Sequence, residues 1–235
     1  MASMEKVALI SGANKGIGFE VAKGLARAGM HVYAGARDAE RGREAERRLR
    51  DLGLDATWIA PDVTDPHSIE RARETSARRW ERLDILVNNA GIATRSSAEP
   101  AVIYATNVFA VAQMIRTLTP LLARARGRVI NVSSSLGSLT RLSDRQHFES
   151  QVGPEIWQYA SSKAAVNALT VLFATTLAEQ GISVNAVCPG YCATDLNDHT
   201  GPRSPEQGAQ IVLKQALTPE PGTGAYLEDA GVVPW

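Results

Sequence analysis

Cysteine and histidine are scarce in this chain of 235 residues, which contains two cysteines and four histidines. The cysteines, Cys188 and Cys192, flank Pro189-Gly190, and this spacing fits neither a disulfide framework nor a metal site. We therefore interpret both as free thiols. The histidines are scattered, without a His-x-x-x-His pair or a carboxylate cluster, so the sequence predicts no metal centre.

Long apolar runs and an excess of one charge are also missing. No apolar run reaches the ~18 residues that a membrane span needs, and the N-terminus lacks the basic start and apolar region of a secretory signal. Basic and acidic residues number 25 each, so neither nucleic acid nor a membrane is an expected partner. We expect a cytoplasmic protein in which residues 1–235 form one domain.

Short apolar runs typical of strands alternate with longer helical patterns along most of the chain. This alternation predicts an α/β fold, in which a doubly wound, mainly parallel sheet of about seven strands carries helices on both faces. The expected strands cover residues 6–10, 31–35, 56–59, 83–87, 128–132 and 182–187, with an edge strand near 225–227. The expected helices include residues 16–28, 101–118, 159–179 and 204–217.

A glycine-rich loop follows the first expected strand and leads into the first helix. Its glycines allow the backbone to approach a phosphate closely, and the helix N-terminus offers unpaired N–H groups and a positive dipole. The loop is therefore a candidate pyrophosphate site, and an ordinary glycine-rich turn is the alternative. The candidate residues are Gly12, Asn14, Lys15, Gly16, Ile17 and Gly18.

The second expected strand is followed by Ala36, Arg37 and Asp38. In a dinucleotide-binding fold an acidic residue at this point holds a ribose hydroxyl, whereas an arginine receives a 2′-phosphate. Arg37 and Lys15 would form a cationic pocket for the additional phosphate of NADP, because arginine can bind phosphate through two bonds. Asp38 leaves NAD open as an alternative, although we favour Asp38 as the N-cap of the next helix.

Polar residues also follow the third and fourth expected strands. Asp62 is suited to accept a hydrogen bond from an adenine amino group, with a simple turn as the alternative. The fourth strand stops at Asn88-Asn89-Ala90-Gly91, at the edge of the sheet where ligands bind in open α/β folds. Both positions extend the candidate ligand site along this edge.

Tyr159 and Lys163 lie four residues apart at the start of a long apolar helix, so both side chains lie on one helix face. A cation beside a tyrosine lowers the pKa of the phenol from ~10, which would make the pair an acid/base device. An ordinary surface pair is the alternative. Ser133-Ser134-Ser135 follow the fifth strand, and Asn107 lies among apolar neighbours in the preceding helix, where a satisfied core amide is the alternative.

Together these residues resemble the short-chain dehydrogenase/reductase family over essentially the whole chain. Its motifs occur in the family's order: Gly12-x-x-x-Gly16-x-Gly18, Asp62, Asn88-Asn89-Ala90-Gly91, Asn107, the serines after the fifth strand, Tyr159-x-x-x-Lys163 and Pro189-Gly190. Segments 14–18, 36–38 and 204–209 look most like the NADPH-dependent carbonyl reductases. The resemblance implies a Rossmann-like fold and reversible hydride transfer from NADPH to a ketone or aldehyde.

The resemblance also implies a role for each residue of a catalytic set. Tyr159 would donate a proton to the substrate carbonyl, while Lys163 would lower the pKa of Tyr159 and hold the nicotinamide ribose. Ser134, which alignment selects over the two adjacent serines, would orient the carbonyl oxygen. Asn107 would position a water that links Lys163 to solvent.

For the cofactor, NADP(H), the resemblance implies contacts from several further loops. Asp62 and Val63 would contact adenine, and Thr194 would contact the nicotinamide carboxamide. Asn89 and the neighbouring backbone would lie on the ribose side. The remaining implied contacts come from Ala90, Gly91, Pro189 and Gly190, together with the glycine loop, Arg37, Tyr159 and Lys163.

The expected substrate is a small carbonyl or alcohol compound, and residues 136–157 read as an insertion over its site. The apolar 159–179 helix favours a homodimer or homotetramer, although the insertion can block packing of that helix and keeps a monomer open. Two alternative functions remain. One is a 3-oxoacyl-thioester reductase, for which Arg141 and Arg145 would offer a basic entrance, and the other is a catalytically silent NADP-binding protein.

Overall fold

The computed structural model describes residues 5–93, 99–144 and 156–235. Its strands are β1 (Val7–Ser11), β2 (His31–Gly35), β3 (Ala56–Ile59), β4 (Ile85–Asn88), β5 (Arg128–Val132), β6 (Ser183–Val187), β7 (Tyr226–Glu228) and β8 (Gly231–Val232). Within the described ranges they form one eight-stranded sheet in the order β3-β2-β1-β4-β5-β6-β7-β8. Neighbouring strands are parallel except β7 and β8.

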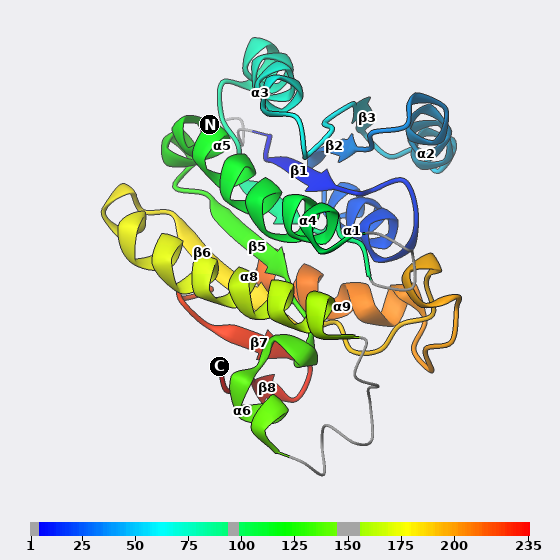
Figure 1. Cartoon of the computed structure of the whole chain (residues 1–235). Helices are drawn as coiled ribbons and strands as arrows, with labels where there is room; N and C mark the ends of the chain where they lie inside the picture. Colours follow the sequence, from blue (N-terminus) through cyan, green and yellow to red (C-terminus); the bar gives the residue numbers. More distant parts are fainter. Residues whose placement is uncertain (1–4, 94–98, 145–155) are drawn as a thin grey trace.

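Helices cover both faces of the sheet (Figure 1). The α-helices are α1 (Gly16–Arg27), α2 (Ala39–Asp51), α3 (Pro66–Trp80), α4 (Pro100–Tyr104), α5 (Ala110–Ala125), α6 (Leu139–Ser143), α8 (Trp157–Thr176) and α9 (Pro205–Leu217). Shorter helical segments are the π-helix η1 (Ala105–Phe109) and the 3-10 helices η2 (Ser135–Gly137), η4 (Ala178–Gln180) and η5 (Asp195–Asn197).

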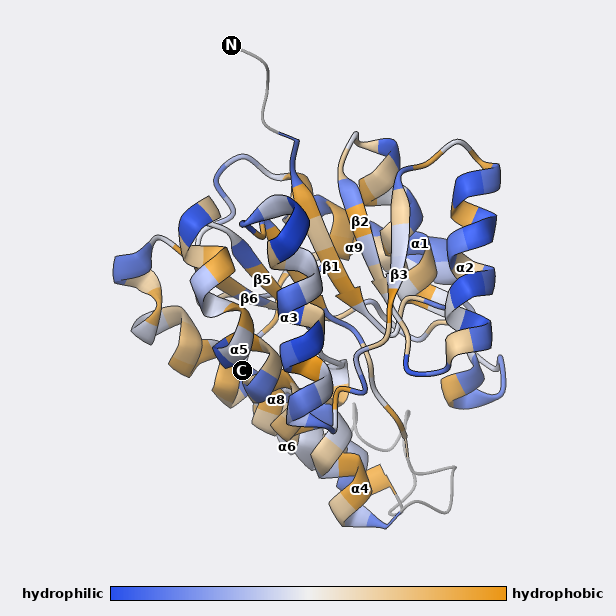
Figure 2. Ribbon diagram, turned by 90° about the horizontal axis from the view of Figure 1, so that it is seen from above, coloured by the Kyte–Doolittle hydropathy of each residue, from blue (hydrophilic) through white to orange (hydrophobic). Residues whose placement is uncertain are grey.

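Two apolar clusters divide the core between the faces of the sheet. One cluster joins the strands to α1, α2 and α9 through side chains such as Leu25 and Ile211. The other joins the opposite face to α3, α5 and α8 through side chains such as Leu118 and Val166. Figure 2 shows the apolar central strands between these helix layers, with hydrophilic residues along the outer sides of α2 and α3. Burial of apolar side chains on both faces explains why the central strands are almost continuously apolar.

The parallel register brings the loops after the strands to one edge. Ser11 pairs with Gly35 at the ends of β1 and β2, and Asn88 pairs with Asn131 near the ends of β4 and β5. Because parallel strands share their direction, the glycine loop and the loops after β2, β4, β5 and β6 all emerge at the carboxyl edge of the sheet. This edge therefore gathers the residues that the sequence singled out.

The predicted doubly wound α/β fold is confirmed, with two differences in detail. The sequence predicted about seven strands, and the eighth, β8, is two residues long and pairs antiparallel with β7. So short a strand carries no periodicity, so only its pairing reveals it. The helix predicted over residues 101–118 is three segments, in which η1 separates α4 from α5.

The continuous helical region Pro100–Ala125 is long and apolar enough to cross a membrane by length and composition alone. The same properties are found in core helices of globular folds, and one such helix is weak evidence for a span. Its residues Met114, Leu118 and Leu122 pack into the core against the sheet. The side of this region that faces the sheet is thus part of the core.

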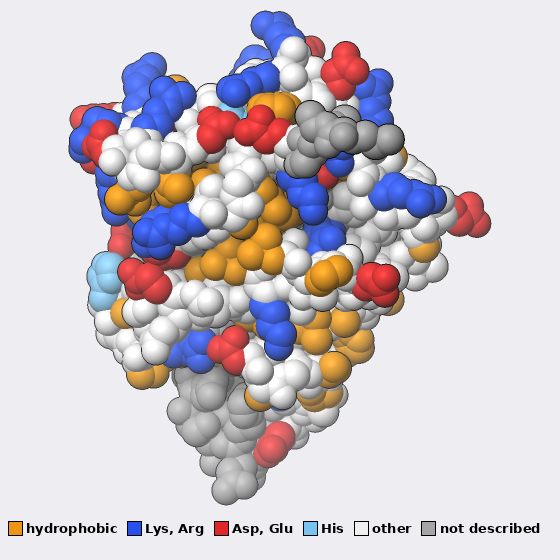
Figure 3. Space-filling model, turned by 180° about the vertical axis from the view of Figure 1, so that it is seen from behind, with side chains coloured by type: hydrophobic (Ala, Val, Ile, Leu, Met, Phe, Trp, Pro, Cys, Tyr) orange, Lys and Arg blue, Asp and Glu red, His pale blue; other side chains and the backbone are white. Residues whose placement is uncertain are grey.

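Charges of both signs are interspersed over the face opposite that of Figure 1 (Figure 3). Several of the helix charges are paired locally, as in Arg47, which binds both Glu44 and Asp51 on α2. The visible face consequently presents no extended field of a single sign, the feature that attracts nucleic acid or anionic lipid.

Candidate active site

Tyr159 and Lys163 come from the first two turns of α8, which begins at Trp157. Lys163 is buried, and its Nζ donates a hydrogen bond of 2.8 Å to the carbonyl oxygen of Val132, the last residue of β5. The same Nζ lies 5.6 Å from the ring centroid of Tyr159. The helix thus brings the phenol and the ammonium together at the carboxyl end of β5, where the sequence predicted them.

Burial controls the acidity of both groups. Desolvation raises the pKa of Tyr159 to about 12, although the hydrogen bond with the Ser134 side chain opposes this shift. Desolvation likewise lowers the pKa of Lys163 to about 8. Because removal of water dominates the pKa of Tyr159 here, the lowering of that pKa by Lys163 stays a prediction.

The three serines after β5 have different partners. Ser133 is 2% exposed, and its hydroxyl donates a 2.7 Å hydrogen bond to Oδ1 of Asn167 on α8. Ser134 is the N-cap of η2, where its Oγ accepts a 3.3 Å hydrogen bond from the N–H of Leu136, and it also meets the Tyr159 phenol. Of these three serines, Ser134 is thus the hydrogen-bond partner of Tyr159, whereas Ser133 fastens the strand end to α8.

Asn107 lies in the middle of η1 and is 1% exposed. Its Oδ1 accepts from the N–H of Ile92, and its Nδ2 donates to the Ile92 carbonyl and to Ser162 Oγ, at 2.9 to 3.0 Å. A Cβ at Gly91 would lie 3.4 Å from Asn107 Oδ1 and 3.7 Å from Lys163 Nζ. Asn107 therefore lies beside the site as a satisfied amide, and its water bridge to Lys163 stays a prediction.

The glycine loop after β1 needs its glycines for close approach. Gly12 has a φ of +65°, and a Cβ there would lie 3.0 Å from the Cα of Ala90. A Cβ at Gly18 would lie 2.3 Å from the Gly12 carbonyl oxygen. Nδ2 of Asn89 donates to the carbonyl oxygens of Ser11 and Gly12, both at 3.0 Å. Asn89 thus supports the loop through its side chain, a role that the sequence did not predict.

The N-terminus of α1 is suited to an anion. Lys15 is its N-cap, and in the described part of the chain no side chain caps this terminus and no acidic residue occupies its first turn. The backbone N–H groups of Gly16 and Ile17 open this helix, where a phosphate binds to the unpaired donors and the helix dipole. The glycine cradle and the uncapped terminus together fit the pyrophosphate of a dinucleotide.

The loops after β2 and β3 combine a cation and a turn carboxylate. Asp38 caps α2 by accepting a 2.9 Å hydrogen bond from the N–H of Arg41, which confirms its favoured role. Asp62 accepts from the N–H and hydroxyl of Thr64 at 3.0 and 2.7 Å. Burial opposes ionisation of Asp62, but the Thr64 bonds and the charge of Arg37 outweigh it and lower its pKa. Arg37 and Asp62 therefore lie close enough to influence each other.

Val63 reaches the same edge from the loop after β3. With Ser11, Asn88 and Ala90 it lines a small cavity. Of the predicted cofactor contacts, Val63 and Ala90 thus line one cavity, and their contacts with adenine and ribose stay predictions. The amide of Asn88 has a different function, because its Nδ2 donates a 2.8 Å hydrogen bond to Asn131 Oδ1 and links β4 to β5.

Lys15, predicted to bind the 2′-phosphate together with Arg37, has a partner from another loop in this structure. Its ammonium forms an ion pair with the carboxylate of Asp195, in the loop after β6. Thr194, the N-cap of η5, lies against the glycine loop, because a Cβ at Gly16 would be 3.4 Å from Thr194 Cγ2. The structure thus joins the predicted pyrophosphate and carboxamide regions, and Asp195 is a member that the sequence did not single out.

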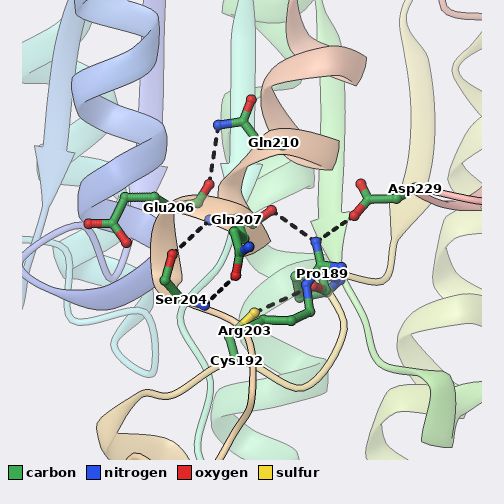
Figure 4. Close-up of polar contacts among 8 residues, drawn as sticks. All are labelled: Pro189, Cys192, Arg203, Ser204, Glu206, Gln207, Gln210 and Asp229. Carbon is green, nitrogen blue, oxygen red and sulfur yellow. Dashed lines mark hydrogen bonds and ion pairs between the residues drawn. The ribbon is translucent and has the colours of Figure 1, made fainter.

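Arg203 joins the end of this loop to α9 and to the turn between β7 and β8 (Figure 4). Its guanidinium donates to the Gln207 carbonyl at 3.1 Å and pairs with Asp229 at 2.5 Å. Gly190 has a φ of +78°, and a Cβ there would lie 2.8 Å from Arg203 Cδ, so Pro189-Gly190 shapes the chain beneath the arginine. No local pattern marks Arg203, because Asp229 is 26 residues away in sequence.

Both cysteines are free, as predicted, and both are buried. Cys188 lies near the catalytic pair, where it opposes the lowering of the Lys163 pKa. Burial raises the pKa of the Cys188 thiol and also that of Cys192. Both therefore remain neutral thiols near physiological pH.

The model of the short chain dehydrogenase family matches residues 6–204 of this chain. Carbonyl reductase (NADPH) 1 of Mus musculus is 34% identical over 278 aligned positions, which cover 100% of both chains. Carbonyl reductase (NADPH) 1 of Bos taurus is also 34% identical, with the same coverage. The predicted likeness to NADPH-dependent carbonyl reductases is therefore confirmed.

Solved structures show the same similarity. The NADPH-bound carbonyl reductase from chicken fatty liver superposes with a TM-score of 0.86 and 27% identity, over 99% of this chain and 100% of that one. Salutaridine reductase from Papaver somniferum superposes with a TM-score of 0.83 and 27% identity, over 96% and 100% of the two chains. The whole fold, and not the glycine loop alone, is shared.

Proposed function

Because this chain belongs to the short-chain dehydrogenase/reductase family, we propose that it reduces ketones or aldehydes with NADPH, reversibly, and that Tyr159 is the general acid/base. One observation carries this proposal: the phenol of Tyr159 meets the Ser134 hydroxyl while Lys163 lies beneath its ring. A proton donor, a second hydroxyl and a cation thus converge at the edge of the sheet where the family places its cofactor.

The three side chains divide the work on the carbonyl oxygen. NADPH, when bound, supplies the hydride. Tyr159 gives its proton to the developing alkoxide, and its raised pKa keeps it in the protonated form that reduction requires. The Ser134 hydroxyl orients the oxygen, and the Lys163 ammonium stabilises the negative charge left on the phenol. In the reverse direction Tyr159 withdraws the proton from an alcohol.

The cofactor is held by the loops at the carboxyl edge of the sheet. The uncapped terminus of α1 would bind the pyrophosphate, and Arg37 would bind the 2′-phosphate. Asp62 and Val63 would contact adenine, while Thr194 would contact the carboxamide. The exposed position of Arg37 supports this assignment, since within the described residues no hydrogen bond or ion pair holds its side chain.

Large exposed apolar side chains near the catalytic set support an apolar substrate. Leu139, Trp157 and Tyr191 lie within a few residues of a site residue in the sequence, and the main-chain oxygen of Trp235 accepts a 3.0 Å hydrogen bond from the N–H of Thr140 on α6. The exposed side chains are Leu139 (66%), Trp157 (57%), Tyr191 (52%) and Trp235 (36%). An apolar rim of this kind favours aryl or alkyl carbonyl compounds over charged ones.

The thioester alternative has less support. Arg141 is bound to Glu228 through two hydrogen bonds of 2.8 and 2.6 Å, so the carboxylate of Glu228 already neutralises its charge. A phosphate-bearing acyl carrier would need free cations at the entrance. Arg145 and half of the predicted insertion, residues 145–155, fall outside the described residues, and the place of the insertion over the substrate site stays a prediction.

Substitution of Tyr159 by phenylalanine tests the proposal. We expect Tyr159→Phe to lower kcat by roughly 10²- to 10⁴-fold while NADPH still binds, because the ring remains and only the proton donor is lost. Tyr33→Phe is the matched control, since Tyr33 is a buried phenol of β2 in the apolar core. Undiminished turnover in Tyr159→Phe would contradict the proposed role of Tyr159 as general acid/base.

A substrate panel separates the remaining alternatives. Rates on an aryl ketone and on an acetoacetyl thioester, each with NADPH and NADH, distinguish a carbonyl reductase from a thioester reductase. We expect the ketone with NADPH to be fastest. Cofactor binding without oxidation of NADPH across the panel would indicate the catalytically silent protein instead.

The proposal also includes the oligomeric state of the protein and its location in the cell. Exposed apolar side chains on η1 and α8, such as Phe109, Val171 and Leu172, support a homodimer or homotetramer. A monomer stays open, and light scattering of the purified protein would decide between these states. The cytoplasmic location also stays a prediction.

A further inference from the structure

Tyr226 is a buried phenol that contacts the catalytic loop from the opposite end of the chain. It is the first residue of β7 and is 0% exposed. Its hydroxyl donates a hydrogen bond to the main-chain carbonyl of Ser134, 92 residues away. The side chain therefore spans from β7, past β6, to the end of β5.

The packing around the Tyr226 ring restricts the direction in which its hydroxyl points. The ring of Trp235 stacks on it, with centroids 5.5 Å apart and planes inclined by 24°. Cys188 and Val233 complete the apolar cluster around the ring. Burial also raises the pKa of this phenol far above its ordinary value, so it remains a donor at every accessible pH. A buried donor must have an acceptor, and the Ser134 carbonyl provides it.

The direction of the Ser134 side chain depends on the orientation of the peptide group that follows it. Its backbone is extended, with φ −157° and ψ 150°, immediately before η2 begins. The carbonyl that Tyr226 binds also accepts a 2.7 Å hydrogen bond from the N–H of Gly137. Two donors on one carbonyl fix the plane of that peptide, and the direction of the Ser134 side chain follows from it.

The residues that follow Tyr226 form hydrogen bonds with the segment that follows Ser134, at the beginning of α6. The Ser138 hydroxyl donates to the Pro234 carbonyl at 2.6 Å. The Thr140 hydroxyl donates to the main-chain oxygen of Trp235 at 2.7 Å. Residues 226–235 consequently hold both Ser134 and the beginning of α6.

We propose that Tyr226 is a positioning residue, which holds the Ser134 carbonyl so that the Ser134 hydroxyl stays in register with the Tyr159 phenol. Tyr226 acts through Ser134 and touches neither substrate nor cofactor. The inference rests on the proposed function, because it gives Ser134 a part in the reaction. It adds that a residue near the far end of the sequence sets the geometry of the catalytic serine.

The substitution Tyr226→Phe removes only the hydroxyl. The ring can still stack on Trp235, and the Ser134 carbonyl keeps the Gly137 N–H as a partner, so the variant leaves no unpaired acceptor on that carbonyl. We expect kcat for an aryl ketone to fall roughly 10- to 100-fold, since a small displacement of a catalytic group has effects of this size. KM for the ketone and the dissociation constant of NADPH, measured by fluorescence titration, should stay unchanged.

A double-substitution cycle separates positioning from a purely structural role. In a Ser134→Ala background, Tyr226→Phe should cause no further loss of kcat, because its effect passes through the missing hydroxyl. Tyr33→Phe, which removes another buried phenol, should leave kcat unchanged in either background. An unchanged kcat in Tyr226→Phe, or a loss that simply adds to that of Ser134→Ala, would overturn the proposal.

These outcomes are distinct from failure of the proposed function. If Ser134→Ala alone retains full turnover, Ser134 has no part in the reaction and the proposed function is what fails. If Ser134→Ala is impaired while Tyr226→Phe is fully active, only the positioning role fails. Thermal unfolding of each variant confirms that the compared proteins are folded.

Discussion

The ammonium of Lys15 is paired with the carboxylate of Asp195, so one ion pair joins the glycine loop to the loop after β6. The other carboxylate oxygen of Asp195 lies 3.0 Å from His199 Nε2. Lys15 was predicted to bind the 2′-phosphate together with Arg37. An incoming NADPH would therefore compete with Asp195 for this cation.

We predict that Asp195→Asn strengthens NADPH binding by about two- to fivefold and leaves NADH binding unchanged. The range is that of an exposed ion pair, which releases little free energy when it is broken. Fluorescence titration with both cofactors measures the effect, and in a Lys15→Ala background the gain should disappear. Weaker binding of both cofactors would show instead that the pair fastens the loop over the dinucleotide.

Arg37→Ala should weaken NADPH binding by roughly tenfold or more, because a hydrogen bond to a charged group contributes about 1.5–3 kcal/mol. NADH lacks the 2′-phosphate and should bind as before. Arg43→Ala is a suitable control, since Arg43 is a basic residue of α2 whose guanidinium stacks over Trp58 at 5.1 Å. An equal loss for NADPH and NADH would mean that Arg37 does not read the phosphate.

Ser133→Ala should mainly affect stability, whereas Ser134→Ala should mainly affect catalysis. Ser133→Ala removes the donor to Asn167 Oδ1 and should lower the free energy of unfolding by about 1–3 kcal/mol, the cost of leaving a buried acceptor unpaired. Ser134→Ala should lower kcat with a nearly normal unfolding curve. Chemical denaturation and steady-state kinetics on both variants test the pair, and the reverse pattern would assign catalysis to Ser133.

The rate of reduction should depend on pH through Lys163. Its pKa is lowered to about 8, so the ammonium is fully present below that pH and is lost as the pH rises through it. Because the pKa of Tyr159 is raised to about 12, the phenol stays protonated across this interval and does not produce the decline. We expect kcat/KM for reduction to be level below about pH 8 and to fall above it.

Lys163→Arg distinguishes this origin of the decline. Arginine keeps its charge throughout this range, so any activity that remains in the variant should show no decline near pH 8. A profile that still bends at the same pH in Lys163→Arg would assign the decline to a different group. Cys188, whose thiol lies near Lys163, is the next group to test by substitution with serine.

Much of the site could be predicted from sequence because its signals are local. The glycine loop, the Asn88-Asn89-Ala90-Gly91 segment and the Tyr159/Lys163 spacing each lie within a few residues at a predicted strand end or helix start. Parallel strands then bring such ends to one edge, so a correct strand pattern already implies that these residues meet. The role of Asp38 as an N-cap followed from the same kind of local rule.

Three features depended on contacts between distant parts of the chain. Lys15 turns to Asp195, 180 residues away, and Tyr226 reaches Ser134, 92 residues away. The pKa of Tyr159 is raised because its phenol is buried, and burial is a property of packing and not of spacing. Hydrophobic period and turn chemistry are set by neighbouring residues, so the sequence by itself determined the fold class and placed Tyr159 and Lys163 together on one helix. Partners across strands and the loss of water around a side chain arise only when the whole core assembles, and these the tertiary structure decided.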